Sequence, residues 1–351
     1  MKKKIIQTVF FTLCILFCLS VGISSFFSSA DAQLERREVA DMPEFVYGDA
    51  TWGERLNEAL TSRTPFRAAA LTAKTLLLEK VFHTSAVEQV ILGSDGWLYF
   101  NDTTADYLGT EPLSAQEITQ IVDTLQRMNA YCNEQSAKFI FTVAPNKNTL
   151  YPAHMPPRYL RGDDSNYDRL TDALRGTDIP FVDFHSLPQN SAEPLYYRTD
   201  THWNAEGALI AYNTLMDALE LPHADYRDTP RVNGEKVGDL ELMLHPTRPR
   251  AETERVPDYA FSYSYIGRLR SEEDITIQTV NSDGSGSLLM FRDSFGNALL
   301  PLLAEHFNAA YFSRAVPIDL SLIESQQADT VIYEIAERNL RNIIDYPPII
   351  P

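Results

Sequence analysis

Two short segments of this 351-residue chain combine the residue types of a serine acyl-transfer site. Asp200 and His202 stand two positions apart in Asp-Thr-His-Trp, and Ser294 lies much later in Arg-Asp-Ser-Phe-Gly. A histidine can deprotonate a serine hydroxyl, and an acid can hold that histidine in the required tautomer. If the three side chains meet in space, the sequence predicts covalent catalysis with Ser294 as the nucleophile.

Ser294 occupies a position from which it can act as a nucleophile. It follows an apolar run at 287–291 and precedes a helical pattern at about 297–306. A serine on such a strand-to-helix turn exposes its hydroxyl, and the nearby helix N-terminus stabilises an oxyanion. Serine is also favoured as the N-cap of a helix, which is a purely structural role. On the residues alone, both roles remain open.

Asp200 and His202 have structural alternatives as well. Asp200 can cap the helix predicted to begin near Asn204, and His202 can be a packed, hydrogen-bonded residue. The two can also be metal ligands together with His185, although no fourth ligand is evident in the sequence. No glycine-rich phosphate loop or dinucleotide fingerprint is present. The sequence therefore predicts neither a cofactor nor a metal.

Residues 1–32 have the pattern of an export segment. Three lysines at positions 2–4 precede an apolar run from Ile5 to about Phe27, which is long enough to span a bilayer. Ala30-Asp31-Ala32 has the small-x-small pattern of a cleavage site. We predict a signal anchor or a signal peptide, and length favours the anchor. The body is then extracytoplasmic, anchored to the cytoplasmic membrane or secreted after cleavage at Ala32.

Charge and cysteine content exclude some classes of protein. The formal net charge is -18 and the sequence pI is about 4.8, which repels nucleic acid. Cys132 is the only cysteine beyond the apolar run, so the exported body has no internal disulfide. The fold must therefore be held together by its hydrophobic core.

From residue 114 onward, helical and strand patterns alternate. A capping box at Ser114 and Glu117 opens the first helix. Predicted helices span about 115–135, 167–175, 204–219, 297–306 and 320–326, and predicted strands span 138–144, 179–184, 287–291, 309–312 and 330–335. Such alternation indicates a mostly parallel sheet covered on both faces, which is a three-layer α/β/α architecture.

Three regions precede or interrupt this alternation. Residues 33–90 are predicted to form a helical stalk or N-terminal subdomain, with one helix beginning at Thr64-Pro65. Residues 90–100 have the signature of a hairpin around a glycine-containing turn. Residues 222–285 are rich in Pro, Asp, Arg and Gly. They are predicted to be an insertion in a catalytic domain of residues 91–351 and to form a rim over the site.

Several polar segments follow directly on predicted strands. They are Pro145-Asn146-Lys147, Ser294 and residues 334–338. The carboxyl ends of parallel strands meet at one edge of a sheet, and active sites of open α/β sheets lie there. The loop that carries Asp200 and His202 enters a helix and is expected on the same side. We therefore predict that these segments converge.

Four segments carry motifs that occur together elsewhere: Ile-Leu-Gly-Ser-Asp-Gly-Trp-Leu-Tyr at 91–99, Val-Ala-Pro-Asn-Lys with Tyr-Pro at 143–152, Asp-Thr-His-Trp within 197–208, and Arg-Asp-Ser-Phe-Gly at 292–296. In this order they resemble the G-x-D-G-W-L-F hairpin, the strand-end P-x-K segment, the D-x-H-W signature and the nucleophile block of the AlgJ/AlgX-type alginate O-acetyltransferases and the related DHHW proteins. The resemblance covers nearly all of the predicted exported body and implies an SGNH-hydrolase-like fold.

The resemblance implies a role for each residue of the catalytic set. Ser294 is implied as the nucleophile, His202 as the base and Asp200 as the orienting acid. Thr201 replaces the first histidine of the DHHW name, which leaves the acid–base pair untouched. Arg292 stands where ordinary SGNH enzymes have a glycine before Asp-Ser, so we expect a differently built oxyanion hole.

Further residues are candidates for oxyanion and substrate binding. The expected oxyanion donors are the backbone N–H of Ser294 and a group from Asn146 or Gly296. Lys147 and Arg198 are candidates for binding the sugar or carboxylates, and a structural ion pair or solvated charge is the alternative. Tyr151 and Arg292 complete this set.

The resemblance implies an exported O-acetyltransferase that moves acetyl groups onto hydroxyls of a cell-surface or secreted polysaccharide through an acetyl-serine intermediate. It also implies a membrane-bound O-acyltransferase partner that supplies the acetyl group from the cytoplasmic side. An acetyl-esterase with the same triad is the nearest alternative. A non-catalytic glycan-binding or assembly protein is the alternative from another class.

Overall fold

The computed structural model describes residues 2–25, 41–45, 47, 49–62, 73–191, 193–246 and 248–351. The chain forms two compact units, one of residues 1–87 with 242–250 and the other of residues 88–241 with 251–351. All residues predicted to do chemistry belong to the second unit.

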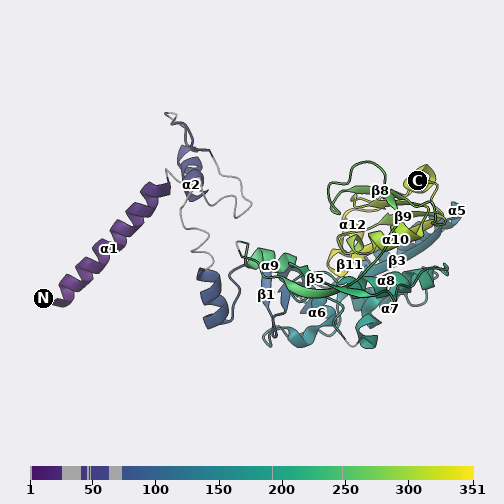
Figure 1. Ribbon diagram of the computed structural model, residues 1–351, viewed down its shortest axis with the longest axis horizontal. Helices are drawn as coiled ribbons and strands as arrows, with labels where there is room; N and C mark the ends of the chain where they lie inside the picture. Colours follow the sequence, from purple (N-terminus) through teal and green to yellow (C-terminus); the bar gives the residue numbers. More distant parts are fainter. Residues whose placement is uncertain are drawn as a thin grey trace. The chain divides into compact units, whose positions relative to one another are not determined.

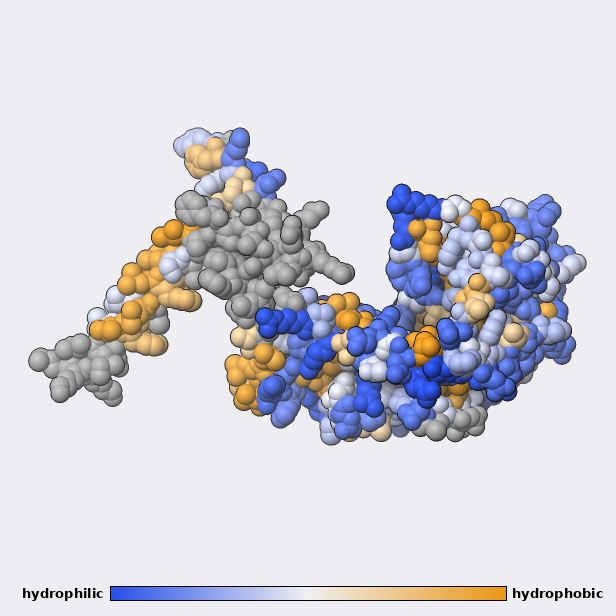
Figure 2. Space-filling model, viewed as in Figure 1, coloured by the Kyte–Doolittle hydropathy of each residue, from blue (hydrophilic) through white to orange (hydrophobic). Residues whose placement is uncertain are grey.

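The first unit is helical over much of its described part, including residues 73–77. It also contains α1 (Lys2–Ser25), α2 (Trp52–Ser62) and the π-helix η1 (Leu78–Phe82). Hydrophobic residues lie along the surface of α1 (Figure 2). Among them, Phe11 and Phe17 are more than half exposed. Among the described helices, none meets the length and apolarity needed to cross a membrane. The predicted cleavage site and the predicted helix start at Thr64-Pro65 lie outside the described residues.

The second unit is built on a seven-stranded sheet (Figure 1). Its order is β4 (Phe181–Asp183), β3 (Lys138–Ala144), β11 (Thr330–Ala336), β9 (Ser287–Phe291), β10 (Ala309–Ser313), β8 (Thr276–Val280) and β7 (Ser264–Tyr265). The first five strands are parallel, β8 pairs antiparallel with β10, and β7 pairs antiparallel with β8. The prediction of a mostly parallel sheet is therefore refined to a mixed sheet.

Helices cover both faces of this sheet, which confirms the predicted α/β layers. Neighbouring residues of β3 point to opposite faces, with Ile140 in one core and Phe141 in the other. One face packs against α8 (Ala205–Ala218) and α10 (Leu300–His306). The other packs against α5 (Ala115–Glu134), α7 (Asn166–Leu174), α11 (Leu322–Gln326) and α12 (Asn342–Asp345). Because central strands are buried on both sides, they read as continuous apolar runs.

Two helix starts follow from local chemistry. The capping box is formed, because the Ser114 side chain accepts from the Glu117 N–H and the Glu117 carboxylate accepts from the Ser114 N–H at 2.7 Å. Asn204 caps α8, accepting from the Gly207 N–H at 2.9 Å. The cap fixes where the loop carrying His202 ends.

The helix predicted from about residue 297 begins later than expected. A 3-10 turn, η5 (Phe295–Asn297), follows β9, and α10 starts only at Leu300. Pro301 lies in the first turn of α10, where its missing N–H costs no hydrogen bond. Ser294 therefore precedes a tight turn rather than a regular helix.

Residues 222–285 form two separate structures. β5 (Arg231–Lys236) pairs with β6 (Glu252–Pro257) in an antiparallel ribbon that contacts α8, and α9 (Asp239–Leu244) lies between them in the chain. The later part supplies β7 and β8 to the edge of the central sheet. Short elements complete the unit: the β1 (Val90–Leu92) and β2 (Leu98–Phe100) hairpin, α4 (Thr104–Tyr107), α6 (Lys147–Leu150), and the 3-10 turns η2 (Asn101–Thr103), η3 (Pro152–His154), η4 (Phe184–Asn190) and η6 (Glu337–Asn339).

Candidate active site

Asp200, His202 and Ser294 meet in one hydrogen-bonded chain. Nε2 of His202 lies 2.8 Å from Oγ of Ser294, and Nδ1 of His202 lies 2.6 Å from Oδ1 of Asp200. Ser294 comes from the turn after β9, and the other two come from the loop before α8. Sequence segments that are 92 residues apart thus supply one site.

The Ser294 hydroxyl does not cap the turn that follows it. Its contact is with the imidazole instead, so the N-cap alternative does not describe this side chain. The His202 ring also packs on Phe295, with ring centroids 4.7 Å apart, and the Trp203 indole N–H donates to the Phe295 carbonyl at 3.1 Å. These contacts hold the nucleophile turn against the loop that carries His202.

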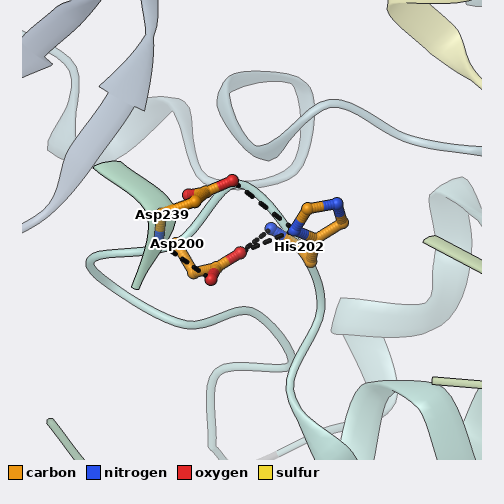
Figure 3. A group of neighbouring side chains, drawn as sticks. All are labelled: Asp200, His202 and Asp239. Atoms are coloured by element: carbon orange, nitrogen blue, oxygen red, sulfur yellow. Dashed lines mark hydrogen bonds and ion pairs between the residues drawn. The ribbon is translucent and has the colours of Figure 1, made fainter. Parts of the chain in front are cut away.

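Asp200 is buried and acts as an acceptor. Its Oδ1 accepts from the backbone N–H of His202 at 3.0 Å, and its Oδ2 accepts from that of Asp239 at 3.0 Å (Figure 3). Burial alone would raise the pKa of Asp200, but its hydrogen bonds and charge interaction with His202 lower the pKa to about 2. An ionised Asp200 holds a proton on Nδ1 and leaves Nε2 to accept from Ser294.

The depressed pKa of Asp200 predicts a specific pH dependence of stability. Because the folded pKa is about 2 and the unfolded value is about 4, the carboxylate stabilises the fold above about pH 4. That contribution is lost as the pH falls toward 2. The free energy of unfolding should therefore differ more between wild type and Asp200→Asn near pH 5 than near pH 2, as measured by denaturant titration. An equal difference at both pH values would contradict this assignment.

Asp239 supports the same loop from α9. Its two carboxylate oxygens accept from Thr201, Oδ1 from the backbone N–H at 2.8 Å and Oδ2 from the hydroxyl at 2.5 Å. The Thr201 oxygen lies 3.1 Å from Nδ1 of His202. Asp239 was not predicted from the sequence, because it lies in the irregular segment 222–285. Its position directly after Gly238 is the one local signal.

Gly238 allows the chain to pass close to the loop. An added Cβ would lie 2.1 Å from the Thr199 carbonyl oxygen and 2.7 Å from the Asp200 nitrogen. Gly238→Ala must therefore displace the backbone that carries Asp200. We expect turnover of an acetyl ester to fall about 100-fold and the unfolding free energy to fall by about 1–3 kcal/mol.

Gly53→Ala is the matched control, since a Cβ there meets no atom within 4 Å. It should leave turnover unchanged. Wild-type turnover in Gly238→Ala would show that the loop tolerates displacement and would contradict the need for this close approach.

Three acidic or imidazole groups of the site satisfy the spacing of a cation site. Ligand atoms of Asp200, His202 and Asp239 all lie within 4.8 Å of one another (Figure 3). The short Nδ1 to Oδ1 contact is a hydrogen bond, however, and Nε2 is directed to Ser294. His185, considered as a third ligand, lies against Asp168 at 3.6 Å instead. In this structure the ligand atoms of His202 are engaged in hydrogen bonds with Asp200 and Ser294, an arrangement suited to proton transfer.

Lys147 is buried and does not face solvent, contrary to its predicted role in binding sugar. Its Nζ donates to the backbone carbonyls of Tyr197 at 3.1 Å, Arg198 at 3.0 Å and Asp200 at 2.6 Å. These three bonds use all three N–H groups of an ammonium. Lys147 therefore fixes the backbone on which Asp200 is mounted.

The surroundings of Lys147 act on its pKa in opposite directions. Burial lowers the pKa to about 7, and the charges of Asp200, Asp239 and Glu252 oppose that shift. The ammonium also lies 5.7 Å from the centre of the Trp97 ring. The sequence placed Lys147 correctly after a strand, but its burial depends on the hairpin and loop that cover it.

Glu252 of β6 holds the same loop from the side of the ribbon. Its carboxylate accepts from the backbone N–H groups of Arg198 at 3.0 Å and Thr199 at 2.9 Å, and from the Thr199 hydroxyl at 2.5 Å. The Arg198 side chain is exposed. Of the two predicted sugar-binding cations, only Arg198 faces outward.

Tyr151 has a structural position. Its hydroxyl accepts from the Leu195 N–H at 2.8 Å, and its ring packs against Trp97 with centroids 4.9 Å apart. Tyr151 thus joins the β1–β2 hairpin to the start of the loop. Its predicted role in substrate binding is replaced by this support.

The Arg292 side chain is also held by hydrogen bonds within the protein. It is 5% exposed, and its guanidinium donates to the Asn297 side chain and to the Glu272 carbonyl, the latter at 2.9 Å. Burial lowers its pKa to about 10. Gly296 packs on it, because an added Cβ would lie 2.7 Å from the Arg292 Cβ. Arg292 therefore shapes the nucleophile turn instead of presenting its side chain to substrate. The predicted part of Gly296 in the oxyanion hole stays a prediction.

Asn146 and Ser294 retain unused donors. The Asn146 side chain is 1% exposed, and neither its Nδ2 nor its Oδ1 has a partner among the described residues. Within that same part of the chain, no hydrogen bond takes the Ser294 backbone N–H. A cavity of about 10 Å³ borders Asn146, Thr201 and Arg338. The role of these two groups as oxyanion donors stays a prediction.

Comparison with known proteins identifies the family. The model of the family described as "SGNH hydrolase-like domain, acetyltransferase AlgX" matches residues 90–275, which is more than half of the chain. The chain belongs to this family. Two curated relatives are named probable alginate O-acetylase AlgJ: that of Pseudomonas syringae pv. tomato is 27% identical over 133 residues, and that of Pseudomonas putida is 26% identical over 137 residues.

The extent of these matches is limited. The aligned part is 37% of this chain in both cases, and it spans about a third of each relative, 33% and 34%. PatB1 of Bacillus cereus has a similar structure, with a TM-score of 0.52 at 16% identity over 70% of this chain and 95% of PatB1. A structure of PatB1 with a sulfonyl adduct gives 0.54 at 15% identity over 72% and 97%. These two structures establish the shared fold.

Proposed function

We propose that this protein is an exported O-acetyltransferase that transfers acetyl groups to hydroxyls of a polysaccharide through an acetyl-Ser294 intermediate. The observation that carries the proposal is the placement of His202 between Asp200 and the Ser294 hydroxyl, at 2.6 and 2.8 Å. Membership of the AlgX acetyltransferase family supports acetyl as the transferred group.

In the first half-reaction, Nε2 of His202 takes the Ser294 proton while Oγ attacks the acetyl carbonyl of the donor. The tetrahedral oxyanion forms beside the Ser294 N–H and the Asn146 amide. The donor's leaving oxygen departs with the proton from His202, and an acetyl ester remains on Ser294. In the second half-reaction, His202 deprotonates an acceptor hydroxyl, which attacks that ester and restores the Ser294 hydroxyl.

The proposal also covers the source of the acetyl group and the cellular location of the protein. We infer that residues 1–32 direct export, either as a retained anchor or as a segment removed after Ala32. Because the reaction then takes place outside the cytoplasm, the acetyl group has to be passed across the membrane. A multispanning membrane-bound O-acyltransferase is the proposed partner for that step, and the polysaccharide is the acceptor.

Product analysis tests the proposal. The purified protein is incubated with p-nitrophenyl acetate and oligosaccharides, and the products are separated by mass spectrometry. We expect acetylated saccharide in the presence of acceptor, with none formed by His202→Ala. Free acetate alone, with no saccharide product, would favour an esterase that uses the same residues and water. Failure to consume the donor at all would favour a non-catalytic glycan-binding protein.

A further inference from the structure

A cavity of about 860 Å³ lies beside the loop that carries Asp200 and His202. Its walls come from residues 191 and 193–198, from the first turns of α8 and from the β5–β6 ribbon. The volume is in the range of a pocket for an organic ligand. Ser294 is not among the residues that border it, so the cavity is separate from the reacting atoms.

Most charged side chains of the wall are satisfied within the protein. Arg231 pairs with Glu206 at 2.5 Å, and the Tyr197 hydroxyl bonds to Glu254. Glu252 is used by the backbone N–H groups described above. These interactions make the wall rigid and remove four carboxylate and guanidinium groups from any direct role in holding a ligand.

Three charged side chains at the cavity are left over. Arg198, Arg255 and Glu193 border it and are exposed, and in the described part of the chain their side chains make no hydrogen bond or ion pair. They are accompanied by apolar surface from Pro194 and Ile210, which are partly exposed. Unpaired charged donors and acceptors beside an apolar floor suit a ligand that has many hydroxyls and apolar C–H faces, which is a saccharide.

The wall of the cavity is continuous with the loop that carries Asp200 and His202. Arg198 lies two residues before Asp200, and the backbone between them is held by Lys147 on its carbonyl side and by Glu252 on its N–H side. A ligand in the cavity is therefore held at a fixed position relative to His202. The β5–β6 ribbon that supplies Glu252 and Arg255 lies alongside α8 (Figure 1).

We propose that this cavity is a remote acceptor subsite, which binds saccharide units of the polysaccharide chain next to the unit that is acetylated. The proposal rests on the proposed O-acetyltransferase function. The charged residues that border the cavity are three arginines and four glutamates, so the cavity has no excess of positive charge for a polyanion, and we assign a neutral saccharide chain as the ligand.

The test compares acceptors of different length. Glucan, mannan and N-acetylglucosamine acceptors are supplied as monosaccharides and as longer oligomers, with p-nitrophenyl acetate as donor. In Arg198→Ala and Arg255→Ala, we expect the KM for the longer oligomers to rise about tenfold, since each variant loses hydrogen bonds from a charged group. The KM for monosaccharides should change less than about twofold, because one unit does not reach the subsite.

Arg268→Ala is the matched control, since Arg268 is an exposed arginine that does not border the cavity. The KM of this variant should change with acceptor length in the same way as the KM of wild type. Equal KM values for wild type and the cavity variants with long oligomers, or equal effects on short and long acceptors, would overturn the subsite.

A binding measurement separates this inference from the proposed reaction. Calorimetric titration of Ser294→Ala protein with the same oligomers does not need turnover. Binding of long oligomers that weakens about tenfold in Arg255→Ala supports the subsite even if no acetyl is transferred. Absence of a preference for long over short oligomers in every series would overturn it even if transfer occurs.

Discussion

Ser294→Ala is expected to lower kcat for turnover of p-nitrophenyl acetate by about four to six orders of magnitude. The variant removes the only oxygen that lies within hydrogen-bond reach of Nε2 of His202 among the described contacts, at 2.8 Å. Without it, the imidazole has no nucleophile to activate and no acetyl ester can form. Turnover is measured by release of p-nitrophenol, and circular dichroism and thermal unfolding check that the fold is retained.

Ser321→Ala is the control for this variant. Ser321 also directly precedes a helix, has helical backbone angles and makes no capping hydrogen bond with its side chain, as is true of Ser294. Alanine at position 321 should leave kcat unchanged. If both variants turned over like wild type, Ser294 would have only the structural role of a residue before a helix.

The second large effect is expected from Lys147→Met. Methionine fills a similar volume but leaves the carbonyls of Tyr197, Arg198 and Asp200 without their common donor. The Arg198 carbonyl keeps the Leu98 N–H as a donor at 2.8 Å, so two carbonyls lose the donor described here. Buried acceptors without a partner cost about 1–3 kcal/mol each, so we expect the unfolding free energy to fall by about 2–6 kcal/mol. Loss of the Lys147 hydrogen bonds should also lower kcat about 100-fold, because Asp200 no longer holds His202 at a fixed position.

Lys138→Met tests whether this effect is specific to the three hydrogen bonds made by Lys147. Lys138 begins β3, the strand that precedes Lys147; it is exposed and donates to a single carbonyl, that of Leu219, at 2.9 Å. We expect a change of about 1 kcal/mol or less in unfolding free energy and unchanged kcat. A decrease in kcat with little change in KM for Lys147→Met supports a positioning role. A loss of stability without any change in kcat of the folded protein would contradict it.

The parts that follow local rules were predictable from the sequence. The capping box at Ser114 and the N-cap at Asn204 place α5 and α8 to within a residue or two, because side chain to backbone bonds act over three positions. The apolar runs of β3, β9 and β11 reflect burial on both faces. The approach of Ser294 to His202 follows from both lying at the carboxyl edge of the sheet.

The supports of the site were not predictable, since they depend on contacts distant in the chain. Asp239 and Glu252 come from an irregular segment whose pattern has neither a helical nor a strand period. Lys147 and Arg292 were both predicted to belong to the oxyanion and substrate-binding set, and only the packed structure shows that each is 5% exposed. A single sequence records the charge of such residues but not the backbone groups that surround them.

The most direct test of the account is to identify the residue that carries the acetyl group. The protein is mixed briefly with p-nitrophenyl acetate, quenched in acid and digested, and the peptides are analysed by tandem mass spectrometry. We predict one acetyl group on Ser294, absent from Ser294→Ala and His202→Ala, that disappears when an acceptor saccharide is added before the quench. Turnover of the ester with an unmodified Ser294, or with an acetyl group that forms on another residue and is lost to the acceptor, would contradict the account.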